Sequence, residues 1–224
     1  MIKAVLFDLD NTLIDFMRIK KTSVDAALNA MLNAGLEMSK EEASEKLYGL
    51  YRKIGLEHQK IFQKFLKKVM GRIDYKILAT GIVAYRKAQV EVLKPYSKVL
   101  PTLKKLKKKE LKLAIISDAP RLKAWIRLVE MELQNFFDVI ITYDDTKKYK
   151  PHKAPFIAVL KQLNVAPENC LMVGDRPERD IHGAKSLGMT TAFAKYGATK
   201  DVVSDADYEL KSIGELVEII EKEK

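Results

Sequence analysis

Cysteine is almost absent from this sequence, since Cys170 is the only one among 224 residues. A single cysteine excludes an internal disulfide bond and a zinc site built from several cysteines, and it is typical of a reducing compartment. Long apolar runs are missing too, because no stretch approaches the ~20 apolar residues that a membrane-spanning helix needs. The amino terminus enters an apolar segment directly, without a basic and then apolar signal region. We therefore expect a cytoplasmic protein with no membrane partner.

Strand patterns are lacking between residues 18 and 93. Apolar side chains in this stretch recur at helical spacing instead. Ser39 followed by Glu42 is a capping-box pattern that starts the second of these helices. The four helical segments that we predict are 24–32, 39–54, 61–70 and 77–92. Four successive helices with short connectors predict an antiparallel bundle.

Positive charge exceeds negative charge, with 40 Lys and Arg against 30 Asp and Glu and a formal net charge of +10. Such a balance raises the possibility of a nucleic-acid-binding protein that has lost catalysis. The densest lysine cluster, residues 104–109, ends a predicted helix, where lysines complement the helix dipole and stay solvated. We therefore expect no nucleic-acid partner, and a basic surface can equally attract an anionic substrate.

Strands and helices alternate in the rest of the chain, which is typical of a mostly parallel sheet covered by helices on both faces. The predicted strands are 2–7, 111–117, 139–142, 170–174 and 190–194. The predicted helices are 98–109, one starting near 120, 153–164, 178–187 and 212–221. The fold class is therefore α/β, with a Rossmann-like sheet. We predict a core domain of residues 1–15 and 95–224, into which residues 16–94 are inserted as a helical domain.

Polar residues follow the predicted strands at the ends where open parallel sheets bind ligands. Asp8 and Asp10 end the first strand, and they repel each other unless a cation or a proton lies between them. Each of the other residues has an ordinary explanation by itself, such as a turn or a helix cap, but together they indicate one site. They are Ser117, Asp118, Lys150, Asp175 and Asp180.

These motifs, in this order, resemble those of the haloacid dehalogenase superfamily of hydrolases. The first motif is Asp8-Leu9-Asp10-Asn11-Thr12, and the second is Ser117 after an apolar run. The third is Lys150-Pro151, and the fourth is Gly174-Asp175 followed by Asp180. The resemblance covers the whole chain. It implies a Rossmann-like core, and it implies that the helical insertion is a C1-type cap.

The resemblance also implies roles for these residues. Asp8 would be the nucleophile that forms an aspartyl-phosphate, and Asp10 would be the general acid and base. Lys150 would offset the negative charge, and Ser117 would donate to a phosphate oxygen. The implied cofactor is Mg²⁺, held by Asp8, the backbone carbonyl of Asp10, and Asp175, with Asp180 in support. The further residues that we expect near the substrate are Asn11, Thr12, Asp118 and Arg18.

Asp10 favours a phosphatase, because dehalogenases of the family lack the second acid of the first motif. Asp118 departs from the family pattern, where Asn is common. The acid at this position would serve either to cap a turn or to make an altered contact with the substrate. The predicted function is hydrolysis of a small phosphorylated metabolite, and the enzymatic alternative is a sugar-phosphate phosphomutase. The oligomeric state stays open between monomer and homodimer.

Overall fold

The computed structural model describes residues 1–223, and the chain divides into two compact units. One unit comprises Met1–Phe16 and the chain from Lys94 onward, and the other is Met17–Leu93. Each unit has an apolar core of its own.

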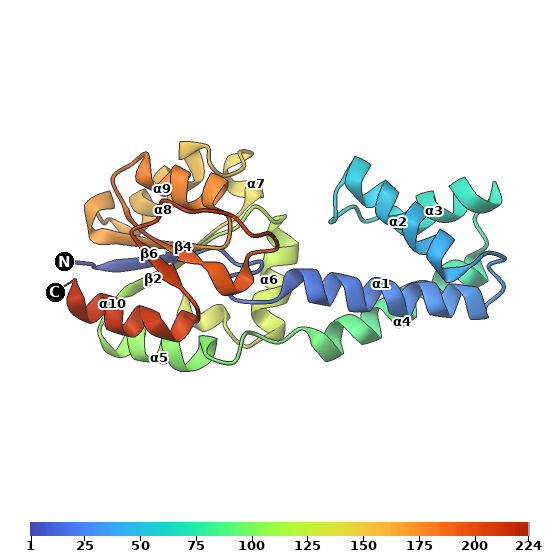
Figure 1. Ribbon diagram of the computed structural model, residues 1–224, viewed down its shortest axis with the longest axis horizontal. Coiled ribbons are helices and arrows are strands. Elements are labelled where there is room, and N and C mark those ends of the chain that lie inside the picture. The colour runs from blue at the N-terminus through green and yellow to red at the C-terminus, as the bar shows by residue number, and fades with distance from the viewer. Residues whose placement is uncertain (224) are drawn as a thin grey trace. The chain divides into compact units, whose positions relative to one another are not determined.

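A parallel sheet is the centre of the first unit (Figure 1). Its six strands in the described chain are ordered β3-β2-β1-β4-β5-β6, and every neighbouring pair is parallel. The four central strands are apolar and almost wholly buried, as expected for a sheet covered on both faces. The strands are β1 (Ala4–Phe7), β2 (Lys112–Ile116), β3 (Val139–Ile141), β4 (Cys170–Gly174), β5 (Thr190–Ala194) and β6 (Tyr208–Leu210).

Helices cover both faces of this sheet, with α8 and α9 on one side and α5 and α10 on the other (Figure 1). Alternate side chains of the strands point to opposite faces. Leu6 and Ala114 therefore share one core with Phe156 and Val159 of α8. The predicted α/β fold class is confirmed. The helices of this unit are α5 (Val99–Lys108), α6 (Arg121–Glu130), α7 (Tyr143–Thr146), α8 (Lys153–Leu163), α9 (His182–Lys185) and α10 (Leu216–Lys222).

Two short elements of this unit were not predicted, and one predicted helix needs correction. The edge strand β6 (Tyr-Glu-Leu) and the helix α7 (Tyr-Asp-Asp-Thr) contain acidic residues and lack the apolar run that marks β1 and β3, which are equally short. The predicted continuous helix 178–187 is in fact one π-helical turn, Pro177–Ile181, followed by the four-residue helix α9.

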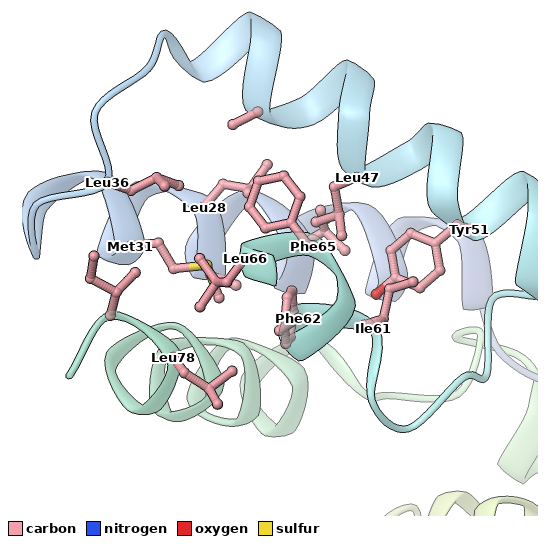
Figure 2. Packing of buried hydrophobic residues seen from close by; sticks show 14 residues of the cluster. Leu28, Met31, Leu36, Leu47, Tyr51, Ile61, Phe62, Phe65, Leu66 and Leu78 are labelled. Atoms are coloured by element: carbon pink, nitrogen blue, oxygen red, sulfur yellow. The ribbon is translucent and has the colours of Figure 1, made fainter. Parts of the chain in front are cut away.

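The inserted unit consists of four helices, as predicted, around a core of apolar side chains (Figure 2). Met31 of α1 and Gly81 of α4 approach so closely that a Cβ atom at Gly81 would lie 2.2 Å from Met31 Cε. Ser39 accepts the Glu42 N–H at 3.1 Å and so caps α2 from the predicted position. The helices are α1 (Phe16–Asn33), α2 (Lys40–Ile54), α3 (Ile61–Met70) and α4 (Tyr75–Val92). Across residues 1–223, we find no helix with the length and apolar character required to span a membrane.

Candidate active site

Three of the predicted site residues directly follow three adjacent strands, β2, β1 and β4. Asp8 comes directly after Phe7, the end of β1, and Ser117 and Asp175 follow β2 and β4 in the same way. The Asp8 N–H donates to the carbonyl oxygen of Val173 at 2.9 Å, so the pairing with β4 continues to this point. Parallel strand order thus brings together three side chains that are far apart in sequence, and all three are buried.

Lys150 is a buried cation among these acids. Its Nζ donates to Asp8 Oδ1 at 2.6 Å and to the backbone oxygen of Ile116 at 2.8 Å, and it lies 2.7 Å from Asp180 Oδ1. Burial by itself would lower the pKa of Lys150, but the carboxylates of Asp180 and Asp8 outweigh burial and raise this pKa above its ordinary value. Lys150 therefore remains protonated at neutral pH.

Oxygen atoms of the three buried carboxyl groups of Asp8, Asp175 and Asp180 lie within 4.8 Å of one another. Burial raises the pKa of Asp175 to about 9, and the charges of Asp8 and Asp180 add to this rise. Burial also raises the pKa of Asp8, and it raises that of Asp180 to about 7, although Lys150 opposes both shifts. Among residues 1–223, the buried Asp175 Oδ1 has no hydrogen-bond partner. Three carboxyl groups against one lysine fit a hard divalent cation, which prefers oxygen ligands.

Gly174 makes room for Asp180. A Cβ atom at Gly174 would lie 2.3 Å from the Asp180 carboxyl carbon, so a larger residue would force this side chain to move. The π-helical turn after β4 carries Asp180, whose Oδ2 accepts the Arg176 N–H at 3.1 Å. The fourth motif needs a glycine at this position, because the backbone of Gly174 lies against the carboxyl group of Asp180.

The loop after Asp8 is supported by a segment that the sequence analysis missed. Asn11 has a φ of 61°, a left-handed conformation that Asn tolerates well. The hydroxyl of Tyr196 donates to the backbone oxygen of Thr12 at 2.7 Å. A Cβ atom at Gly197 would lie 1.6 Å from the backbone oxygen of Asn11. The signal in the sequence was a Tyr-Gly pair two residues after the predicted strand 190–194, at the same edge of the sheet.

Thr12 and Ser117 place hydroxyl groups in buried positions. Within residues 1–223, Thr12 Oγ1 has no hydrogen-bond partner. Ser117 Oγ accepts the Ala119 N–H at 3.1 Å, and a hydroxyl that accepts one hydrogen bond can still donate its own proton. Both groups are therefore able to donate to an anion.

Asp118 holds the loop that carries Lys150. Its Oδ1 accepts the Lys150 backbone N–H at 2.9 Å, and its Oδ2 accepts from Arg179 Nη1 at 3.1 Å. Both carboxylate oxygens thus have protein partners, which accounts for an acid at this position. Arg179 was likewise not predicted from the sequence as a residue of the site.

Asp10 is half-buried, and Arg127 Nη1 donates to its Oδ2 at 2.8 Å. Arg127 lies on α6, on the buried side that also carries Ala124 and Leu128. This arginine was not predicted from the sequence either. An arginine on the apolar face of an amphipathic helix was the signal that could have identified it, because a buried guanidinium needs a partner.

Arg18 and Lys20 lie on α1 of the inserted unit, Arg18 exposed and Lys20 buried. Lys20 Nζ donates to the hydroxyl of Tyr85 at 3.0 Å and lies 5.0 Å from the ring centroid of Tyr51. A substrate contact by Arg18 stays a prediction.

Most of the chain matches a known protein family. Residues 5–194 match one family, described as haloacid dehalogenase-like hydrolase. This chain belongs to that family. The resemblance that the four motifs predicted is thereby confirmed.

Several relatives of this haloacid dehalogenase-like hydrolase match over nearly their full length. The glyceraldehyde 3-phosphate phosphatase of Methanocaldococcus jannaschii is 37% identical over 226 residues, which cover 100% of this chain and 99% of the relative. Pyrophosphatase PpaX of Halalkalibacterium halodurans is 31% identical, covering 98% of this chain and 97% of its own. The crystal structure of a HAD phosphatase from Thermococcus onnurineus has a TM-score of 0.72 at 28% identity, covering 98% of both chains.

Proposed function

We propose that this protein is a Mg²⁺-dependent phosphatase that hydrolyses a small phosphorylated metabolite through an aspartyl-phosphate on Asp8. The observation that carries the proposal is the contact of the buried Asp8 with Lys150, beside the carboxyl groups of Asp175 and Asp180. A bound Mg²⁺ would neutralise these acids and orient the phosphate oxygens. Asp8, Asp175 and the Asp10 carbonyl would hold the ion, with Asp180 in support.

Asp8 attacks the phosphorus atom, and the bond from phosphorus to the ester oxygen breaks. Asp10 donates a proton to the departing alkoxide, which leaves as an alcohol. Asp10 then takes a proton from a water molecule that attacks the same phosphorus. The bond between phosphorus and Asp8 breaks, and inorganic phosphate is released with Asp8 restored.

Hydrogen-bond donors around the phosphate would hold its oxygens during both steps. We assign this role to Lys150, Ser117, Thr12 and Asn11. The proposal is supported by the burial of all four residues. It is also supported by the buried Thr12 hydroxyl, which has no hydrogen-bond partner within residues 1–223. Donors that are fixed before the reaction stabilise the developing negative charge without a cost of reorganisation. Asp118 would contribute by keeping Lys150 in place.

The inserted unit, predicted as residues 16–94, would act as a cap that selects the substrate and excludes water. Arg18 is the residue of this unit that we propose near the leaving group. Glyceraldehyde 3-phosphate is the first candidate substrate, because the relative with 37% identity is named for its hydrolysis. The cytoplasmic location and the choice between monomer and homodimer stay predictions.

Substitution Asp8→Asn tests the nucleophile, since an amide cannot form the aspartyl-phosphate. We expect this variant to release no phosphate from glyceraldehyde 3-phosphate or p-nitrophenyl phosphate, whereas the wild type does so only with Mg²⁺. Asp74→Asn is a matched control, because Asp74 caps α4 by accepting the Ile77 N–H and Asn serves equally well there. Turnover by a folded Asp8→Asn protein would refute the proposed mechanism.

The alternatives predict different products. A phosphomutase would convert a hexose 1-phosphate into its 6-phosphate isomer without net release of phosphate. A nucleic-acid-binding protein without catalysis would bind DNA or RNA in a salt-sensitive way and show no Mg²⁺-dependent phosphatase activity. Assays for phosphate, sugar isomers and nucleic-acid binding on one preparation separate the three functions.

A further inference from the structure

We infer that Arg127 is a positioning residue for Asp10, and that it leaves the Oδ1 atom of Asp10 to exchange the proton during catalysis. The inference rests on the proposed function, in which Asp10 is the general acid and base. Neither the motifs of the family described above nor the mechanism so far includes Arg127.

The contact is short and largely out of solvent. Arg127 Nη1 donates to Asp10 Oδ2 at 2.8 Å, and the side chains of Arg127 and Asp10 are 6% and 23% exposed. The next ion pair along the same helix, Arg121 with Asp145, is far more open, because the Arg121 side chain is 55% exposed. A buried guanidinium depends on its partner more strongly than an exposed one does.

Phe16 restrains the same guanidinium from another side. The Cζ atom of Arg127 lies 4.6 Å from the ring centroid of Phe16, in a cation–π contact. Arg127 also sits on α6 between Ala124 and Leu128, which are fully buried. The guanidinium therefore has a fixed place, and a fixed donor selects one orientation of the carboxyl group it binds.

In this arrangement the two oxygens of Asp10 have different roles. An oxygen that accepts a hydrogen bond from a permanently protonated arginine is a poor site for a proton. Proton transfer to the leaving oxygen, and from the attacking water, is thereby assigned to Oδ1. Proton transfer depends strongly on distance and alignment, so a carboxyl group free to rotate would be in place for a smaller fraction of the time.

The test compares two leaving groups that differ in whether they need a proton from an acid. An alkoxide needs a proton to leave, whereas p-nitrophenolate leaves readily without one. We expect Arg127→Met to lower kcat/KM for glyceraldehyde 3-phosphate by about tenfold or more, a fraction of what a general acid contributes. The value for p-nitrophenyl phosphate should change less than about threefold, because kcat/KM reports only the steps up to the first irreversible one, here the phosphorylation of Asp8.

Two further variants complete the experiment. Arg121→Met, on the same helix, should leave both kcat/KM values unchanged. Arg127→Lys keeps the charge but loses the planar fork, so we expect a smaller loss with the same dependence on the leaving group. If Arg127→Met does not fold, as judged by thermal melting, Arg127→Lys provides the same comparison.

An equal loss for both substrates in the folded Arg127 variants would overturn the inference and leave Arg127 as a structural ion pair. No loss for either substrate would overturn it as well. Absence of phosphatase activity in the wild type would instead refute the proposed function, so the two failures are distinguishable.

Discussion

Single residues of the site are acids whose ionisation is unfavourable where they lie. Asp175 is buried beside two other carboxyl groups, and its pKa of about 9 measures how strongly the folded chain resists its ionisation. Natural proteins accept such costs where a ligand requires them. Within residues 1–223, Asp175 Oδ1 also has no hydrogen-bond partner, and the proposed cation would account for both features.

Substitution Asp175→Asn should stabilise the protein when no metal is present. The folded state holds a proton on Asp175 between pH 4 and about 9, whereas the unfolded chain releases it near its ordinary pKa of 3.8. The wild type therefore loses stability as the pH rises through this window, and Asn removes the loss. We expect a Tm at pH 8 in EDTA that is higher by about 2–4 °C for each kcal/mol gained.

Asp138→Asn is the control, for which we expect the opposite change in Tm. Partial burial would raise the pKa of Asp138, but hydrogen bonds from the Leu113 N–H and from Lys107 outweigh it and lower the pKa. This substitution should therefore lower the Tm at pH 8. Addition of Mg²⁺ should raise the Tm of the wild type and not that of Asp175→Asn. An Asp175→Asn protein that melts earlier than the wild type in EDTA would contradict this account.

At the scale of elements, the end of β4 and the turn after it act together. The strand ends in Gly174, the π-helical turn returns the chain toward it, and Asp180 fills the space that glycine leaves. Asp180 in turn pairs with Lys150. One backbone position therefore controls a carboxylate and a lysine that lie on other elements.

Substitution Gly174→Ala should weaken the metal site without unfolding the chain. The added methyl group would displace Asp180, and residues that orient metal ligands typically contribute about 10–100-fold to metal affinity. We expect the Mg²⁺ concentration for half-maximal activity to rise by this factor. Gly49→Ala on α2 is the control, since its Cβ atom would meet only Arg52 Nη2 at 3.7 Å. An unchanged Mg²⁺ dependence in Gly174→Ala would show that Asp180 does not support the ion.

At the scale of the whole molecule, the chain builds two separate apolar cores. The core of the inserted unit includes Phe65, which is fully buried, and the chain's single tryptophan, Trp125, belongs to the unit with the sheet. Because each unit buries its own side chains, damage to one core should leave the other intact.

Substitution Phe65→Ala should destabilise the inserted unit by about 3–5 kcal/mol, the usual cost of truncating a buried phenylalanine. Urea unfolding followed by far-UV circular dichroism should show a helical transition at lower urea. Trp125 fluorescence, which reports on the unit with the sheet, should keep its midpoint. Val83→Ala on α4 is the control, because Val83 is exposed and surface substitutions usually change stability by less than about 0.5 kcal/mol. A parallel shift of both signals would mean that the units unfold as one.

The sequence by itself determined the α/β fold class, the four inserted helices and the places where the strands end. These features are local, because apolar periodicity, capping residues and motif spacing act over a few residues. It also indicated that Asp8, Ser117 and Asp175 lie at one edge of the sheet, since parallel strands align their carboxyl ends. The short elements β6 and α7 were not predicted because they contain acidic residues and lack the apolar run that marks the equally short β1 and β3.

Only the tertiary structure decided which side chains hold the site residues in place. Arg127 and Asp10 are 117 positions apart, Tyr196 and Thr12 are 184 apart, and Asp118 and Lys150 are 32 apart. No local pattern relates such residues, because each contact depends on where a helix or loop returns to the sheet. The sequence therefore indicated which polar residues lie near the strand ends, whereas the side chains that support them became visible only in the packing of the folded chain.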